Sequence, residues 1–394
     1  MLYTFSQEGD FEMKATTFFG MEELLRQEIL KLGGKNIEVF NRGVSFTGDL
    51  GFLYKANLCL RTALKVLIPI HSFKVYSEDD LYNKLKEVPW NDYFNYQNTF
   101  KIESVLNSDL FSHSLYVAQK AKDAIVDKFR ERYNKRPSVD LIDPDFKIYI
   151  HLYKNELTIS LDSSGDLLNR RGYRVDRGKA PMNEILAAAL VLQSNWQPHQ
   201  QLIDGMSGSG TIAIEAALIG NNVPPGVFRN KYGFMKWKNY NEELFQLIFD
   251  ACLNKIKDNE LKIVAVEKDA LMIPKIKANI KSAKLLDVIE IVNQDFFDYK
   301  PVKLSGVMII NPPYGERLND TEIESLYKKL GDKLKQDFKG LTCWLITSSN
   351  AGKKSIGLHA SKTHTLFNGN LECKFLKYEL YEGSKKQSKS NSGN

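Results

Sequence analysis

Cysteine is scarce in this chain of 394 residues, and its four cysteines are widely scattered. No Cys-x-x-Cys pair occurs, so the sequence supports neither a disulfide framework nor a zinc ribbon. The six histidines are equally dispersed and show no spacing typical of metal ligands. We therefore expect no metal site and a reducing, cytoplasmic environment.

Long hydrophobic runs are also missing. The longest apolar stretches, such as Ala187 to Leu192, are far too short to span a membrane. Residues 1–13 carry three acidic side chains where a signal peptide would need a basic region and an apolar core. Hydrophobic residues make up 43% of the chain, which is typical of a globular protein with a sizeable core. The net charge of +6 is compatible with an anionic partner but too small to identify one.

Hydrophobic periodicity divides the chain into segments of different character. Residues 13–70 combine strand-like and helical patterns in a small α/β unit, and residues 71–162 form a second unit that ends in two alternating strands. Residues 163–181 are rich in glycine and arginine, and we interpret them as a basic linker. Residues 383–394 have the composition of a flexible tail.

The remaining stretch, residues 182–382, alternates helices with short buried strands. This order predicts right-handed crossovers and a Rossmann-like, mostly parallel sheet of seven strands. Asn368-Gly369 separates the last two strands and is a strong hairpin signal, so the sheet should close with a C-terminal hairpin. Trp237 and Tyr240 lie in a long insert after the first helix of this sheet, and we interpret them as packing residues.

A glycine loop connects the first strand of this stretch to a helix. Glycines there let a ligand approach the backbone and leave helix N–H groups pointing at it. A P-loop would need a lysine after the last glycine, and a dinucleotide site would need the G-x-G-x-x-G order; both are absent, which disfavours these ligands. The loop consists of Asp204, Gly205, Met206, Ser207, Gly208, Ser209, Gly210 and Thr211.

Acidic residues end the first three strands and indicate a different cofactor. Asp204 would repel a pyrophosphate but can pair with an ammonium group. Glu267 is placed to accept hydrogen bonds from ribose hydroxyls. Asp295 can accept a hydrogen bond from an adenine amine, with Phe296 beside the ring. The pattern therefore predicts a cofactor that combines a nucleoside with a charged amino-acid tail and has no phosphates.

The fourth strand ends in Asn311-Pro312-Pro313-Tyr314. Proline lacks an N–H group and fixes φ, so the strand must stop at Asn311. Taken alone, this tetrapeptide is more often a turn than an active site. In an open α/β sheet, however, the carboxyl ends of the strands line one crevice. We therefore expect four strand ends to meet there: Asp204, Glu267, Asp295 and Asn311.

The glycine loop together with Asn-Pro-Pro-Tyr resembles the class I S-adenosylmethionine-dependent methyltransferases that act on exocyclic amines of bases. With "NRRGYR", "APMNEILAAAL" and "NPPYGERL", the chain from about Met13 to Glu382 is similar to the THUMP-domain ribosomal RNA guanine-N2 methyltransferases. Two positions depart from the usual pattern of the family: Ser207 replaces a common cysteine, and Gly205 replaces a proline. The second strand ends in Glu267-Lys268-Asp269, so Asp269 is the alternative ribose ligand.

The resemblance implies S-adenosyl-L-methionine as the cofactor and a guanine of 23S ribosomal RNA, methylated at N2, as the substrate. It also implies that residues 13–70 are ferredoxin-like and that residues 71–162 are a THUMP-like RNA-binding domain. A base flipped out of its helix would donate its amine hydrogens to the Asn311 side chain and the Pro312 carbonyl. Tyr314 would provide a stacking face for that base.

Four arginines are candidates for RNA contact, although a solvated surface is an equally good interpretation. They are Arg170, Arg171, Arg174 and Arg317.

Two other functions stay open. An adenine-N6 DNA methyltransferase would use the same tetrapeptide, but the first half of the chain shows no helix-turn-helix signature. A non-catalytic RNA-binding adaptor would keep only a degenerate cofactor fold, whereas the strand-end residues here are intact. The sequence carries no signal for an oligomeric state.

Overall fold

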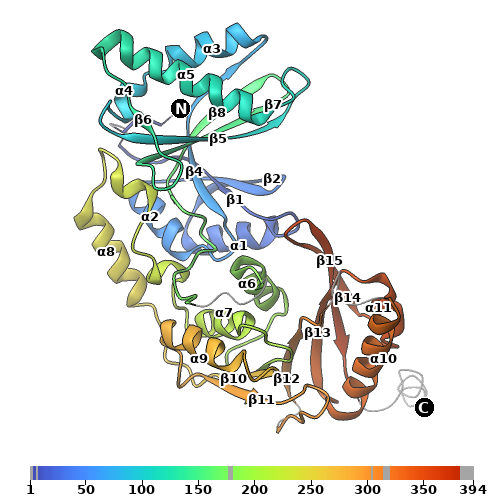
Figure 1. Cartoon of the computed structure of the whole chain (residues 1–394). Coiled ribbons are helices and arrows are strands. Elements are labelled where there is room, and N and C mark those ends of the chain that lie inside the picture. Colours follow the sequence, from blue (N-terminus) through green and yellow to red (C-terminus); the bar gives the residue numbers. More distant parts are fainter. Residues whose placement is uncertain (1–2, 6–7, 176–180, 303–304, 314–319, 382–394) are drawn as a thin grey trace, which may run out of the picture. The chain divides into compact units, whose positions relative to one another are not determined.

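The computed structural model describes residues 3–5, 8–175, 181–302, 305–313 and 320–381 (Figure 1). The chain divides into two compact units, each built around one sheet. Unit 1 takes its described residues from Met1–Thr17, Leu25–Leu168 and Arg229–Asn254. Unit 2 takes its described residues from Phe18–Leu24, Asn169–Phe228 and Lys255–Asn394.

The sheet of unit 1 has eight strands in the order β2-β3-β1-β4-β8-β7-β5-β6. Neighbouring strands are antiparallel, except that β5 is parallel to both β7 and β6. β4 pairs with β1 on one side and with β8 on the other, and the predicted boundary between residues 70 and 71 lies inside it. The strands are β1 (Phe11–Thr16), β2 (Lys35–Phe40), β3 (Gly43–Gly48), β4 (Lys65–Lys74), β5 (Thr99–Asn107), β6 (Ser138–Val139), β7 (Phe146–Tyr153) and β8 (Glu156–Asp162).

Helices cover the sheet of unit 1. α5 packs against β5 and α3, and α8 packs against α2. Side chains cap several helix starts; for example, the Asp49 side chain accepts a hydrogen bond from the Phe52 N–H at the start of α2. The helical segments are α1 (Glu22–Leu32, which begins in the segment assigned to unit 2), α2 (Leu50–Cys59), α3 (Glu78–Glu87), α4 (Trp90–Tyr93), α5 (Ser114–Tyr133), η2 (Gly233–Lys236) and α8 (Glu242–Leu253).

The insert after the first helix of the parallel sheet belongs to unit 1 and not to unit 2. Trp237 is buried, and the Tyr240 ring lies 6.0 Å from the Tyr54 ring, so the prediction that both are packing residues is confirmed. The insert also brings two cysteines together: the Sγ atoms of Cys59 and Cys252 lie 3.5 Å apart, and neither is in a disulfide.

The sheet of unit 2 has seven strands in the order β11-β10-β9-β12-β13-β15-β14. The first five are parallel, and β15 runs antiparallel to β13 and β14, which confirms the predicted mostly parallel sheet with a terminal hairpin. Gly369 supplies the positive φ (63°) that the hairpin turn requires. The strands are β9 (Gln201–Asp204), β10 (Lys262–Glu267), β11 (Ile289–Asn293), β12 (Gly306–Ile310), β13 (Leu341–Thr347), β14 (Lys362–Asn368) and β15 (Leu371–Glu379).

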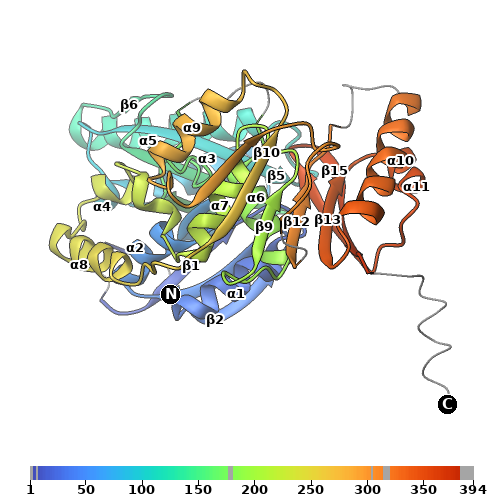
Figure 2. The same ribbon diagram turned by 90° about the horizontal axis from the view of Figure 1, so that it is seen from below.

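Helices lie on both faces of this sheet. Figures 1 and 2 show α6 and α7 on one face and α10 and α11 on the other. No helix in the described ranges is both long enough and apolar enough to cross a membrane. The helical segments are α6 (Glu184–Gln193), α7 (Thr211–Gly220), η1 (Pro225–Phe228), α9 (Ile273–Ser282), α10 (Asp320–Asp337) and α11 (Asn350–Ser355).

Candidate cofactor and active site

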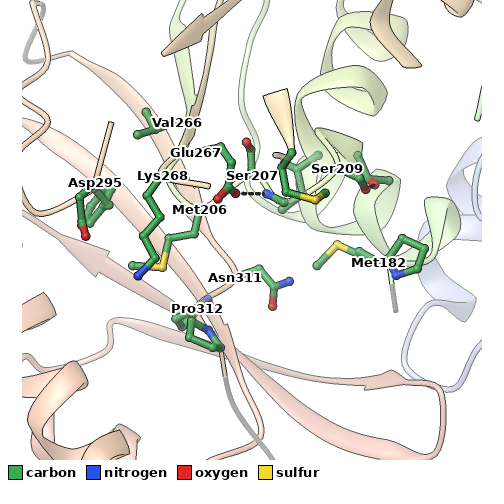
Figure 3. A pocket seen from close by; sticks show the side chains of 18 of the residues that line it. Met182, Met206, Ser207, Ser209, Val266, Glu267, Lys268, Asp295, Asn311 and Pro312 are labelled. Atoms are coloured by element: carbon green, nitrogen blue, oxygen red, sulfur yellow. Dashed lines mark hydrogen bonds between the residues drawn. The ribbon is translucent and has the colours of Figure 1, made fainter. Parts of the chain in front are cut away.

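The carboxyl ends of four parallel strands of unit 2 meet at one cavity of about 440 Å³ (Figure 3). β9 and β12 are neighbours at the point where the strand order reverses, which is where open α/β sheets bind ligands. Pockets of this size hold small molecules such as nucleosides. The predicted residues that line it are Gly205, Ser207, Gly208, Thr211, Glu267, Asp295, Phe296, Asn311 and Pro312.

The glycine loop owes its shape to backbone hydrogen bonds and to two glycines with positive φ. The Gly205 N–H donates to the Ile309 carbonyl (3.1 Å), which ties the loop to β12. Gly208 (φ 56°) and Gly210 (φ 78°) adopt the left-handed conformation that other residues avoid. A Cβ at Gly210 would lie 3.1 Å from Ile276 in α9, whereas a Cβ at Gly208 would meet nothing within 4 Å. Gly210 therefore supports the loop from behind, and Gly208 faces open space.

Glu267 connects the end of β10 to the glycine loop. Its carboxylate accepts hydrogen bonds from the Gly208 N–H (2.7 Å) and the Asp269 N–H (2.9 Å). The Glu267–Gly208 bond is drawn in Figure 3. Asp269, the alternative ribose ligand, accepts from the Leu271 N–H and is not among the described residues that line the cavity. The geometry therefore favours Glu267 over Asp269.

Asp204 is fully buried and, unlike Glu267, Asp295 and Asn311, is not among the described residues that line the cavity. Its Oδ2 accepts a long hydrogen bond from the Ala213 N–H (3.3 Å) at the start of α7, while its Oδ1 has no partner within the described ranges. Burial raises the pKa of Asp204 to about 8; the Ala213 N–H opposes this rise, and the nearby Glu267 carboxylate adds to it. A cation beside this carboxyl would lower its pKa again.

Asn311 directly follows β12, and Pro312 stops the strand from continuing. The Asn311 Oδ1 is buried and has no hydrogen-bond partner in the described part of the chain, and the same is true of the Ser207 hydroxyl. Figure 3 shows Asn311 and Pro312 across the cavity from Glu267. A buried acceptor without a donor is costly, so Asn311 is suited to a ligand that brings an N–H group. Tyr314 lies outside the described residues.

Phe296 gives the cavity an aromatic wall. Its ring stacks on Phe338 (5.3 Å between centroids, 11° between planes), which fixes its orientation. The Asp295 carboxylate accepts a hydrogen bond from the Phe297 N–H (2.9 Å), so Asp295 and Phe296 form one rigid turn after β11. This arrangement places an acceptor beside an aromatic face, and the binding of an adenine there stays a prediction.

Twelve lining residues are outside the predicted set. Seven of them are direct neighbours of predicted residues, so the motifs could have included them: Met206, Ser209, Ile212, Val266, Lys268, Phe297 and Pro313. Pro181 and Met182 belong to the stretch "APMNEILAAAL", which was used only for the family resemblance. Met272, Leu326 and Asn368 come from elements far from the site motifs in the chain, and no local signal marks them as lining residues.

The arginines expected at an RNA surface are placed differently. Arg171 is buried and pairs with Glu215 in α7 (3.3 Å), and Arg174 pairs with Glu184 at the start of α6 (2.7 Å). Arg170 is exposed, and Arg317 lies outside the described residues. The basic composition of this segment predicts a charged surface, but two of its arginine side chains are buried in unit 2. There they form ion pairs with buried carboxylates.

The donor and acceptor set of the cavity fits a cationic nucleoside cofactor. Glu267, Asp295 and Asn311 present oxygen acceptors, and Phe296 presents an aromatic face. Within the described ranges, no three His, Cys, Asp or Glu side chains form a group that could hold a metal ion. The acceptors match an ammonium group, ribose hydroxyls and amine hydrogens, which are the donors of S-adenosylmethionine and of a base amine.

Comparison with family models assigns all three segments of the chain. Residues 171–377 match the RMKL-like methyltransferase domain, residues 75–162 match the THUMP domain, and residues 12–67 match the RlmL ferredoxin-like domain.

Curated relatives resemble the chain over most of its length. A protein of Synechocystis named "Putative RNA methyltransferase slr0064" is 36% identical over 369 residues, which cover 93% of this chain and 96% of that protein. "Ribosomal RNA large subunit methyltransferase K/L" of Syntrophotalea carbinolica is 35% identical over 380 residues, which cover 93% of this chain and 53% of that protein. The chain thus spans about half the length of its K/L relative.

Solved structures share both units. SMU.472, described as a putative methyltransferase complexed with SAH, is 29% identical with a TM-score of 0.85 and covers 96% of this chain and 100% of its own. A predicted N6-adenine-specific DNA methylase from Listeria monocytogenes is 31% identical with a TM-score of 0.84 and covers 94% and 96%. Together with the strand-end cavity, these matches show that the chain belongs to the RMKL-like family of S-adenosylmethionine-dependent methyltransferases, with ferredoxin-like and THUMP domains before the catalytic domain.

Proposed function

We propose that this enzyme methylates the N2 amine of a guanine in large-subunit ribosomal RNA. The observation that carries the proposal is the buried Asn311 Oδ1, which faces the cavity beside Pro312 and lacks a donor in the described part of the chain. An exocyclic amine of a flipped-out base supplies such a donor. The names of the K/L relatives and of the Synechocystis protein support RNA as the substrate, as does the THUMP domain.

The cofactor side of the mechanism rests on three acidic residues. Asp204 would hold the ammonium group, Glu267 the ribose hydroxyls and Asp295 the adenine amine, with Phe296 beside the adenine ring. Bound S-adenosylmethionine supplies a methyl group activated by its sulfonium. Burial raises the pKa of Asp204 to about 8, and an ammonium group beside this carboxyl would favour its ionised form.

The substrate side rests on Asn311 and Pro312. The lone pair of an exocyclic amine is delocalised into the base, which makes the amine a weak nucleophile. Acceptance of both N–H groups by the Asn311 Oδ1 and the Pro312 carbonyl would orient that lone pair toward the methyl group. Orientation of two reactants in this way contributes on the order of 7–11 kcal/mol, so no strong base is needed. The amine proton leaves to water after transfer.

The proposal divides the work between the two halves of the chain. Residues 71–162 would bind RNA by its shape and phosphates, together with the ferredoxin-like residues 13–70. Residues 182–382 would carry out the transfer, and residues 163–181 would connect the two parts.

An adenine amine is the second candidate substrate, since the solved Listeria relative is named as a predicted N6-adenine DNA methylase. The two acceptors on Asn311 and Pro312 serve either amine equally well.

Mass mapping of modified nucleosides tests both candidates. We expect ribosomal RNA from a strain that lacks this gene to lose one N2-methylguanine in the large subunit, and the wild-type gene to restore it. The gene with Asn311→Ala should not restore it. Loss of an N6-methyladenine mark instead would support the second candidate. Loss of no mark in RNA or DNA, with no stabilisation of the protein by S-adenosylhomocysteine, would favour a non-catalytic adaptor.

A further inference from the structure

The Arg174 side chain donates four hydrogen bonds inside unit 2. Its Nε donates to the Glu184 Oε1 (2.7 Å), and its Nη1 donates to the Ser209 hydroxyl (3.1 Å). Its Nη2 donates to the Met182 carbonyl (3.2 Å) and to the Thr211 hydroxyl (3.0 Å). The side chain is 9% exposed, so these bonds are protected from water.

Three of the four acceptors belong to residues that line the cofactor cavity. Met182 comes from the segment before α6, whereas Ser209 and Thr211 come from the glycine loop. Arg174 itself is not among the lining residues of the described chain. The guanidinium thus links two parts of the cavity wall, Met182 and the glycine loop. It can influence a bound ligand only through the positions of these residues.

The planar guanidinium explains why arginine occupies this position. Its donors point in fixed directions, so one side chain can bond to several acceptors at once, which a lysine ammonium on a flexible stem does less well. Glu184 fixes the guanidinium by a buried ion pair with side chains 9% and 8% exposed. The remaining donors are then held at the Ser209 and Thr211 hydroxyls, which also lie 3.1 Å from each other.

A second contact binds the same segment to the same loop. Asn279 of α9 is buried; its Oδ1 accepts a hydrogen bond from the Val175 N–H (3.0 Å), and its Nδ2 donates to the Ser209 carbonyl (3.3 Å). Residues 174 and 175 therefore reach Ser209 by two independent routes. We infer from these two sets of contacts that they maintain the distance between residues 174–175 and the glycine loop.

Arg171 provides an internal comparison. It is also buried and paired with a buried carboxylate, Glu215, which accepts a further hydrogen bond from the Tyr173 hydroxyl (3.1 Å). Glu215 is not among the described residues that line the cavity. Arg171 and Arg174 thus share burial, charge pairing and the same segment, but they differ in their described partners: Glu215 does not line the cavity, whereas Met182, Ser209 and Thr211 do.

We propose that Arg174 is a positioning residue of the S-adenosylmethionine site: it holds Met182 against the Ser209–Thr211 part of the glycine loop and so sets the width of the cavity between them. Its effect is on cofactor affinity. Without these hydrogen bonds Met182 and the glycine loop are no longer held at a fixed distance, so the cofactor should bind more weakly.

Calorimetric binding of S-adenosylhomocysteine to full-length Arg174→Lys tests the proposal without any RNA. We expect its Kd to rise by about tenfold or more, because lysine keeps the charge opposite Glu184 but cannot serve all the acceptors. In transfer assays the KM for the cofactor should rise in parallel while the KM for RNA stays unchanged. Since the binding assay contains no substrate, it remains decisive even if guanine proves to be the wrong base.

Arg171→Lys is the matched control. It should lower the melting temperature but leave the Kd for S-adenosylhomocysteine unchanged, since its ion-pair partner Glu215 is not among the described residues that line the cavity. Equal weakening by both variants would overturn the proposal, because it would show a general loosening of the segment. Should Arg174→Lys fail to fold, Glu184→Gln takes its place: it removes the ion pair that anchors the guanidinium, and an unaltered Kd in that variant would equally overturn the proposal.

Discussion

The two walls of the cavity differ in the partners of their side-chain acceptors. On the wall proposed to hold the cofactor (the cofactor wall), Glu267 accepts two backbone N–H groups and Asp295 accepts one, although the Ser207 hydroxyl has no partner within the described residues. On the opposite wall, proposed to hold the substrate (the substrate wall), the Asn311 Oδ1 has no donor within the described residues. The comparison indicates that the protein itself holds the Glu267 and Asp295 side chains, whereas the Asn311 acceptor is left for a ligand.

The substrate wall is expected to give the largest effect. Asn311→Ala removes the unpaired acceptor and should lower the transfer rate by about 100-fold or more, since the amine loses its orientation. The affinity for S-adenosylhomocysteine should not change, because the cofactor wall is intact. Single-turnover methyl transfer and calorimetric binding measure the two quantities. Wild-type turnover in this variant would remove Asn311 from the mechanism.

On the cofactor wall, a substitution should change the affinity for the cofactor. Glu267→Ala removes a charged acceptor, and hydrogen bonds to charged groups contribute about 1.5–3 kcal/mol. We therefore expect the Kd for S-adenosylhomocysteine to rise by about 10- to 100-fold in calorimetry. Asp269→Ala is the control, because Asp269 does not line the cavity. A larger loss in Asp269→Ala than in Glu267→Ala would reverse the assignment of the ribose ligand.

Asp204 should make the free energy of unfolding depend on pH. Its pKa is raised to about 8 in the folded protein, above its ordinary value of 3.8, so between these values the folded state binds a proton that the unfolded chain has lost. The free energy of unfolding should therefore fall as the pH rises from 5 to 8 and level off above 8. Asp204→Asn should lack this contribution. Urea unfolding of both proteins at several pH values measures it, and a difference between them that is independent of pH would contradict the prediction.

The smallest effect is expected at the open glycine of the loop. In Gly208→Ala the alanine must adopt a positive φ, which costs roughly 1–2 kcal/mol of stability. Its Cβ would meet no atom within 4 Å, so no steric clash adds to this cost. Gly33→Ala is matched to it, because Gly33 also has a positive φ and open space but lies in unit 1. Both variants should unfold at lower denaturant concentration, and only Gly208→Ala should weaken binding of S-adenosylhomocysteine. Weakening by Gly33→Ala as well would show that the loss is not local to the loop.

The sequence predicted the catalytic fold closely because its signals are local. Asn368-Gly369 marks the hairpin through the φ that its turn requires, and Pro312 marks the end of β12 through its missing N–H group. The alternation of strands and helices gave the mostly parallel sheet. Once that topology is fixed, the strand ends must share an edge, so Glu267, Asp295 and Asn311 could be placed at one site in advance.

Long-range partners were not predictable in the same way. The run that contains Arg171 and Arg174 reads as a basic surface, yet both side chains pair with glutamates inside unit 2. Charge alone does not distinguish an arginine that faces solvent from one that faces a buried carboxylate. The insert at residues 229–254 likewise shows no sign in its sequence of belonging to unit 1.

The sequence by itself determined the order of the elements, the ends of the strands and the chemistry of the four strand-end side chains. These features depend on the backbone preferences of neighbouring residues and on the spacing of hydrophobic residues along the chain. Only the tertiary structure decided that Arg174 braces the glycine loop and that Cys59 lies against Cys252. The physical reason is that such contacts join residues 35, 37 and 193 positions apart, and close packing of whole elements sets their distances.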